Sequence, residues 1–137
     1  MNLERRQARE LALQLLFQAE FSPQISTSTF LHVFENNFSQ ETRDYAEKII
    51  KFVNENKLKI DEKLSSVSRN WKVERMAIVD RNIIRIAIFE MKISPEQLSS
   101  KIIINEAVEI AKKYGSSESA SFINGILDQI SREEWLL

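Results

Sequence analysis

The segment from Val73 to Met91 is the most apolar part of this sequence, and it constrains the fold more than any other feature. One face carries Met76, Val79, Ile83, Ile86 and Ala87. Ile84, Ile88 and Phe89 place apolar groups on the other faces. A helix that is apolar nearly all round is covered on every side, as the central helix of a bundle is. We therefore predict that the other segments pack around this one.

Glycine and proline are scarce, with two of each in 137 residues. Folds rich in β-strands need many tight turns, so this scarcity predicts an all-α fold with long helices and few loops. Apolar residues recur at helical spacing along most of the chain. The pattern predicts a bundle of about seven helices, over residues 3–20, 28–36, 39–53, 58–68, 73–91, 95–114 and 117–130.

Local signals predict how these helices begin and end. Ser39 is expected to cap one helix, and Ser94–Gln97 resembles a capping box with proline at the first helical position. Ser116 or Ser117 is expected to cap the last helix. Gly115 is expected to end a helix in the left-handed conformation. Gly125 inside the last helix costs about 1 kcal/mol against alanine, which a close approach of two helices would explain.

The whole sequence, residues 1–137, reads as a single domain without repeats or a linker. Hydrophobic residues make up 43% and charged residues 28%, as in globular proteins. No cysteine is present, which excludes disulfides and thiolate metal sites and fits a reducing cytoplasm. We find no apolar run that resembles a signal peptide or membrane span, so we expect a soluble, cytoplasmic protein that does not bind membranes.

Residues for catalysis are few. A Ser-His-Asp triad needs a histidine, and His32 is the only one; a single histidine without cysteine is also a poor zinc site. No glycine-rich phosphate loop exists. Glu106 and Glu109 share a helix face, but such pairs are usually solvated surface charge. We therefore predict a protein that is not an enzyme and uses no metal or cofactor.

The helix predicted at residues 3–20 carries the clearest binding signal. Arg5, Arg6 and Arg9 are expected on its exposed face, opposite a stripe of alanine and leucine. Guanidinium groups suit phosphate because their planar fork donates hydrogen bonds in pairs. The same face continues through Leu13 to Phe17, and an aromatic ring in line with arginines suits RNA, whose unstacked bases lie on aromatic rings.

Other interpretations of this face remain open. The arginines can be an ordinary solvated helix end balanced by Glu4 and Glu10, with Leu13 and Phe17 packed under another helix. The formal net charge of −1 also weighs against strong autonomous binding of nucleic acid, which usually accompanies a basic excess. A local basic face is still compatible with this balance.

Four further residues are considered for a structural or a binding role. Arg81 and Arg85 are expected to pair with carboxylates at the rim of the bundle. Asp80 lies near the apolar face, where a lone carboxylate is costly to bury, so either that side is partly open or Asp80 meets a cation of a partner. Phe122 lies at the edge of an apolar stripe and is expected in the core, with a stacking platform for bases as the alternative.

Three segments together resemble the NusB family of transcription antitermination proteins. They are Arg5–Phe17, with its arginine-rich opening; Val79–Met91, similar to the family's central helix; and Ile104–Gly115, which leads into Phe122–Asp128. Ile104–Gly115 resembles the family's INEAxELAKxYG block, and Phe122–Asp128 resembles its FxNGxLD block. Each motif is weak alone, but their order and spacing are specific. The segment from Ser22 to Asn70 contributes little.

The resemblance implies two helical subdomains packed at an angle. It also implies a function: members bind the boxA element of ribosomal RNA leaders together with NusE, a small-subunit ribosomal protein, and the complex helps RNA polymerase resist termination. Some members form homodimers that hide the RNA surface. Carried over by position, the RNA contacts are Arg5, Arg6, Arg9, Gln14, Phe17, Ser117, Glu118 and Phe122, and the residues that face NusE are Glu74 and Asp80.

This sequence departs from the family in two places. Gln7 stands where many relatives have arginine, and the tail Trp135–Leu137 is not basic, so weak RNA binding without NusE is expected.

A NusB-like module of an RNA methyltransferase is less favoured, because the sequence has no cofactor-binding part. A helical scaffold that binds only proteins is the main alternative.

Overall fold

The computed structural model describes residues 3–23, 26, 32, 36–69, 72–92 and 98–133. No β-strand occurs in these ranges, which confirms the predicted all-α class. The described residues form five α-helices, not about seven. The helices predicted at 39–53 and 58–68 are a single helix, and the helix predicted at 28–36 lies largely outside the described ranges. The elements are α1 (Leu3–Phe21), α3 (Gln40–Val67), the short 3-10 helix η1 (Val73–Arg75), α4 (Ile78–Lys92), α5 (Ser100–Tyr114) and α6 (Ser119–Arg132).

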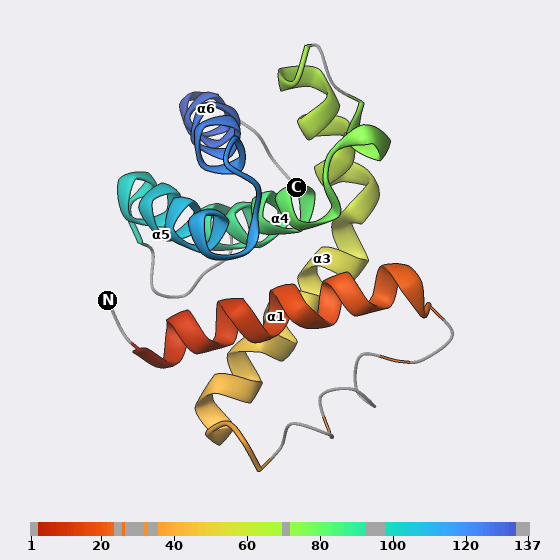
Figure 1. Cartoon of the computed structure of the whole chain (residues 1–137), viewed down its shortest axis with the longest axis vertical. Helices are drawn as coiled ribbons and strands as arrows, with labels where there is room; N and C mark the ends of the chain where they lie inside the picture. The colour runs from red at the N-terminus through yellow and green to blue at the C-terminus, as the bar shows by residue number, and fades with distance from the viewer. Residues whose placement is uncertain are drawn as a thin grey trace.

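Helix α4 is the centre of the fold, as its sequence predicts (Figure 1). It packs against α1, α3, α5 and α6, and every residue from Asn82 to Glu90 is buried. Helix α1 lies across α3 on one side of α4, while α5 and α6 pack together on the other. No helix in the described part of the chain has both the length and the apolar character needed to cross a membrane.

The apolar segment 73–91 is not one helix, contrary to the prediction. η1 ends at Arg75, and Met76 has an extended backbone with φ −68° and ψ 148°. This break turns Met76 into the core, where its side chain is 6% exposed. Helix α4 then begins at Ile78 with Asp80 in its first turn, where a carboxylate interacts favourably with the helix dipole.

Helix α3 merges two predicted helices into one of 28 residues. No glycine or proline interrupts the segment between Val53 and Leu58. Val53 and Ile60 are seven residues apart and therefore share one face, so the buried stripe continues through the predicted gap. Leu58, at the predicted start of the second of these helices, is 83% exposed.

The ends of the helices follow the predictions in part. Ser39 caps α3, as expected, and its side chain accepts a hydrogen bond from the Thr42 backbone N–H at 3.1 Å. Helix α5 is capped by Ser99, and the predicted box at 94–97 lies outside the described residues. The N-cap position of α6 is Glu118, which makes no side-chain cap bond, so neither predicted serine holds that position. Ser116 does contact the start of the helix, because its Oγ accepts a hydrogen bond from the Glu118 N–H at 3.4 Å.

Both glycines differ from their expected roles. Gly115 is extended, with φ −93° and ψ −172°, so the left-handed cap is wrong. Glycine is needed here for space, because a Cβ would lie 2.5 Å from Ser119 Oγ and 2.8 Å from the Ala111 carbonyl oxygen. Gly125 has nothing within 4 Å of such a Cβ, so no close helix approach explains it.

A network of side-chain hydrogen bonds and ion pairs joins α4 to α1 and α3. Glu20 accepts hydrogen bonds from Arg81 and from Asn82, whose Nδ2 lies 2.5 Å away. Arg85 donates to Asn82 Oδ1 at 3.0 Å and holds both carboxylate oxygens of Asp61, at 2.8 and 3.1 Å. The prediction that Arg81 and Arg85 pair with carboxylates is confirmed.

Candidate nucleic-acid interface

The three arginines that open α1 point to three different neighbours. Arg5 turns toward α3, Arg6 toward α5 and Arg9 toward α4. They were predicted to share one exposed face, which is wrong for Arg9, because its side chain is 1% exposed. The sequence pattern missed this because α1 is covered on two sides by helices that come later in the chain.

Arg9 belongs to a buried polar cluster with Glu90 and Tyr45. Its Nε and Nη2 donate to the two carboxylate oxygens of Glu90 at 2.6 and 2.8 Å, and the Tyr45 hydroxyl donates to the same carboxylate at 2.9 Å. Burial alone would lower the pKa of Arg9, but the hydrogen bonds and charge of Glu90 outweigh it and raise that pKa above its usual value. Arg9 therefore fastens α1 to α4 and α3 instead of facing a ligand.

Arg5 is half-buried, whereas Arg6 is exposed. The Arg5 guanidinium carbon lies 3.7 Å from the centroid of the Tyr45 ring, a cation–π contact. Arg6 donates from Nε to Glu106 Oε1 at 3.2 Å, and its side chain is 55% exposed while that of Glu106 is 10% exposed. The rest of the Arg6 guanidinium is thus open to a ligand beside a carboxylate that α5 holds in place.

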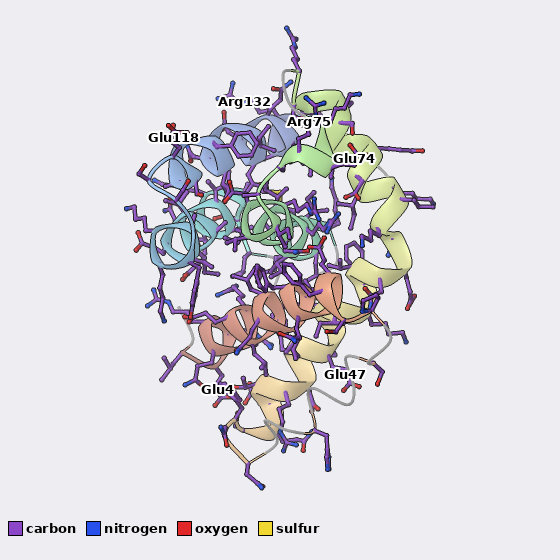
Figure 2. The ribbon with its side chains drawn as sticks, turned by 45° about the vertical axis from the view of Figure 1, so that its right-hand side comes forward. Glu4, Glu47, Glu74, Arg75, Glu118 and Arg132 are labelled. Atoms are coloured by element: carbon purple, nitrogen blue, oxygen red, sulfur yellow. The ribbon has the colours of Figure 1, made fainter. Side chains whose placement is uncertain are left out.

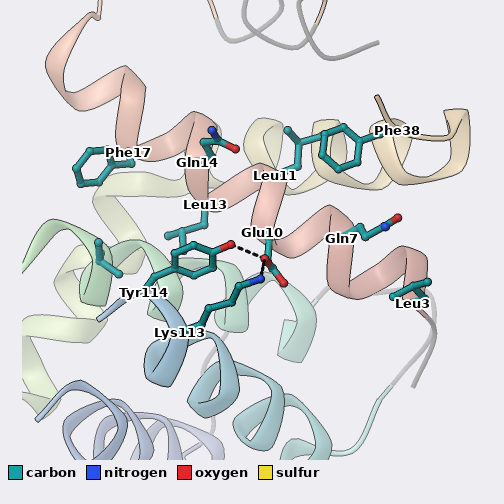
Figure 3. Close-up of a pocket in the computed structure, with 11 residues that line it drawn as sticks. Leu3, Gln7, Glu10, Leu11, Leu13, Gln14, Phe17, Phe38, Lys113 and Tyr114 are labelled. Carbon is teal, nitrogen blue, oxygen red and sulfur yellow. Dashed lines mark hydrogen bonds and ion pairs between the residues drawn. The ribbon is translucent and has the colours of Figure 1, made fainter. Parts of the chain in front are cut away.

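A groove of about 700 Å³ runs along α1 (Figure 3). Gln14 and Phe17, both predicted to bind RNA, lie in this groove, and Phe17 is 37% exposed. The ring of Phe17 packs on that of Phe21, with the centroids 5.0 Å apart. The remaining wall residues are Leu3, Gln7, Glu10, Leu11, Leu13, Phe38, Val79, Lys113 and Tyr114. The groove therefore offers aromatic surface and side-chain amides together.

Lys113 and Tyr114 were not predicted as site residues, although they cover the middle of this groove. They stand at the end of α5, and only the packing of α5 near α1 brings them to Glu10. Glu10 Oε1 accepts a hydrogen bond from Lys113 Nζ at 2.7 Å and another from the Tyr114 hydroxyl. Burial would raise the pKa of Glu10, but these hydrogen bonds outweigh it and lower that pKa.

A second, charged pocket of about 460 Å³ adjoins the groove. Its lining includes Arg6, Glu106, Glu109 and Lys112, and it shares Glu10 and Lys113 with the groove. Glu106 pairs with Arg6 and Glu109 with Lys112, so the two carboxylates do not form a joint site. Among the described residues no three acidic or histidine side chains gather to hold a metal ion.

The turn between α5 and α6 forms another pocket, of about 200 Å³. Glu118 and Phe122, predicted for RNA, line it together with Asp80, predicted for the partner. Ser117 is exposed beside them, and Phe122 is half-buried and packs against the core. The pocket therefore brings together residues that the sequence assigned to two different surfaces.

Asp80 is the unusual group of this pocket. The residue is 8% exposed, and its Oδ1 is buried without a hydrogen-bond partner. An unpaired buried acceptor is costly, so the arrangement suits an added donor or cation. Glu74, the other residue predicted to face the partner, is exposed on η1, and Figure 2 places it next to Arg75 and far from Glu4.

Comparison with known sequences gives consistent results. The model of the NusB family matches residues 6–132. The transcription antitermination protein NusB of Bdellovibrio bacteriovorus is 58% identical over 128 residues, which cover 93% of this chain and 95% of the relative. The protein of that name from Desulforapulum autotrophicum is 44% identical over 130 residues, which cover 93% and 90%.

Solved structures show the same fold. NusB of T. maritima has a TM-score of 0.87 and 33% identity, covering 97% of this chain and 94% of that one. A structure of antitermination factors NusB and NusE in complex with dsRNA has a TM-score of 0.81 and 23% identity, covering 96% and 98%. At that lower identity the likeness concerns the fold alone.

Proposed function

Because this chain belongs to the NusB family, we propose that it is a transcription antitermination factor of the bacterial cytoplasm, a non-catalytic adaptor between RNA and protein. It binds boxA-containing RNA together with NusE, and the complex helps RNA polymerase resist termination. Support comes from the curated relatives, which are named for antitermination, and from the solved assembly of NusB, NusE and dsRNA that shares this fold.

The observation that carries the RNA part of this proposal is the groove along α1. Phe17 offers a partly exposed ring on which a base can stack, and Gln14 offers an amide that both donates and accepts hydrogen bonds. Arg5 and Arg6, at the start of α1, supply guanidinium groups for phosphate. Arg9 is not part of this surface, because Glu90 and Tyr45 enclose it.

The turn between α5 and α6 extends the RNA surface in this proposal. Ser117 and Glu118 contribute exposed polar groups, and Phe122 contributes the edge of its ring. The surface thus spans both helical groups of a single domain: the subdomain of α1 with α3 and the subdomain of α4 with α5 and α6. Binding at both groups at once makes their relative position part of RNA recognition.

The partner surface lies at Glu74 and Asp80. The carboxylate of Asp80 lines the pocket, and in this proposal it pairs with a donor or cation that NusE brings there. Phe122 and Glu118 line the same pocket, so binding of the partner also fixes residues of the RNA surface. This arrangement supports the expectation that RNA binding is weak without NusE.

A second candidate, a scaffold that binds only proteins, is favoured by one observation. Arg6, Lys112 and Lys113 each pair with a carboxylate, and the net charge of the chain is −1. A surface neutralised in this way attracts phosphates weakly. The two functions differ in salt dependence, because contacts with phosphates release counterions and weaken steeply as salt rises.

The deciding experiment measures RNA binding by the purified protein, with and without NusE, at two salt concentrations. The ligands are a boxA-containing RNA and a scrambled RNA of the same composition. We expect NusE to tighten binding to boxA RNA selectively, and higher salt to weaken it. Equal or undetectable binding of both RNAs with NusE present would remove this function and favour the scaffold.

A further inference from the structure

Glu10 lines both the groove along α1, shown in Figure 3, and the charged pocket beside it. One oxygen of its carboxylate accepts from both Lys113 and Tyr114, and these contacts join α1 to the end of α5. A carboxylate that receives an ammonium and a hydroxyl in this way occupies the place that a phosphate oxygen takes in a nucleic-acid complex. The Glu10 carboxylate is therefore an anion of the protein itself that occupies the donors of Lys113 and Tyr114 in the groove.

We infer that Glu10 is an internal competitor of RNA, and that an RNA phosphate displaces its carboxylate from Lys113 and Tyr114 on binding. This inference rests on the proposed function. Lys113 thereby becomes a phosphate contact, and the Tyr114 hydroxyl donates to the phosphate in place of Glu10. Glu10 then lowers affinity for every RNA, and the ligand must supply enough other contacts to displace it.

The exchange is physically easy because the contacts lie at the surface. The side chain of Lys113 is 60% exposed and that of Glu10 is 31% exposed. Exposed ion pairs contribute only a little to stability, so breaking this one costs little. The Glu10 hydrogen bond raises the pKa of Lys113, so its ammonium is charged at neutral pH while it is paired.

Other carboxylates nearby do not share this position. Glu106 is held against Arg6 with its side chain only 10% exposed, and it does not line the groove. Glu109 pairs with Lys112 on its own helix, also outside the groove. Glu109 therefore provides a matched control: it is an acidic residue of the same type, paired with a lysine and close by, but without contact with the groove.

The test compares boxA-containing RNA binding to the NusE complex of the wild-type protein, Glu10→Gln and Glu109→Gln. Glutamine keeps the size of the side chain and removes its charge. We expect Glu10→Gln to tighten RNA binding by about two- to fivefold, the factor that corresponds to an exposed ion pair. Glu109→Gln should change it by less. Equal gains in both variants would mean a general effect of net charge and would overturn the inference.

A second variant decides the question even if Glu10→Gln fails to fold. Lys113→Gln alters an ammonium whose side chain is 60% exposed, and in the inferred complex it removes one phosphate contact. The slope of log affinity against log salt should therefore become shallower by about 0.7. An unchanged slope in a variant that still binds RNA would overturn the inference while leaving the proposed function intact. Absence of selective binding by the wild-type complex would instead refute the proposed function.

Discussion

Arg6 and Arg9 are three residues apart on α1, yet their guanidinium groups meet opposite environments. Arg6 lies at the surface beside Glu106, where water weakens the attraction between the charges. Arg9 is enclosed with Glu90 and Tyr45, where each charge depends on the other. The same residue type is therefore accessible at the surface at one position and joins two helices inside the fold at the other.

Arg9→Ala is expected to lower the free energy of unfolding by about 3–5 kcal/mol, because it leaves Glu90 charged and buried without its partner. Urea unfolding followed by circular dichroism measures this change. Arg6→Ala is the control and should cost at most about 1 kcal/mol. Equal stability of the two variants would contradict the role assigned to Arg9.

Glu20 is expected to make stability depend on pH. Burial alone would raise its pKa, but hydrogen bonds from Arg81 and Asn82 outweigh it and hold the folded-state pKa below the usual 4.5. The stabilisation is therefore present above pH 4.5 and is lost as pH falls through the lower, folded-state value. Glu20→Gln should be less stable than the wild type at pH 7, and the difference should shrink in urea unfolding below pH 4.5. A constant difference across this range would contradict the pKa assignment.

Among the elements, the sequence predicts those with strong periodicity and fails where packing decides. The central position of α4 and the cap at Ser39 follow from local pattern. The continuity of α3 does not follow from local pattern, because the exposed residues around Leu58 resemble a loop in the sequence. Only the structure shows that Val53 and Ile60 are buried on the same face of one helix. The break at Met76 has no local signal either, because it accompanies the packing of that side chain into the core.

The two glycines provide a matched prediction for α5 and α6. Gly115→Ala should destabilise the protein by roughly 1–3 kcal/mol, because its Cβ would collide with Ser119 and with a backbone oxygen. Gly125→Ala should stabilise it by up to about 1 kcal/mol, because the position is helical and open. Thermal unfolding of both variants measures the two effects, and changes of the same sign would contradict this reading of the turn.

For the whole molecule, the sequence indicated which residues to consider but not how they combine. Gln14 and Phe17 do share a groove, whereas Arg9 is turned inward by Glu90, a residue far along the chain. Lys113 and Tyr114 reach Glu10 only because α5 packs near α1. Contacts between distant segments carry no local signature, so a single sequence could not reveal them.

Asp80→Lys is expected to impair binding of NusE more than binding of RNA to the free protein. The substitution places an ammonium where the partner is proposed to bring a donor or cation. Asp80→Asn keeps the shape and should cost about 1.5–3 kcal/mol of partner-binding free energy, as loss of a charge-assisted hydrogen bond does. Calorimetric titration with NusE measures both variants, and unchanged partner affinity in both would place that interface elsewhere.

The enclosed pair of Arg9 and Glu90 also restricts how such a sequence can drift over generations. A lineage that replaces either residue alone passes through a protein with an uncompensated buried charge, which is strongly destabilised. Replacement of both by apolar residues removes the penalty, but the two codons lie 81 residues apart and must change nearly together. We therefore expect substitutions at the two positions to be tolerated only as a pair, whereas exposed Arg6 carries no such constraint.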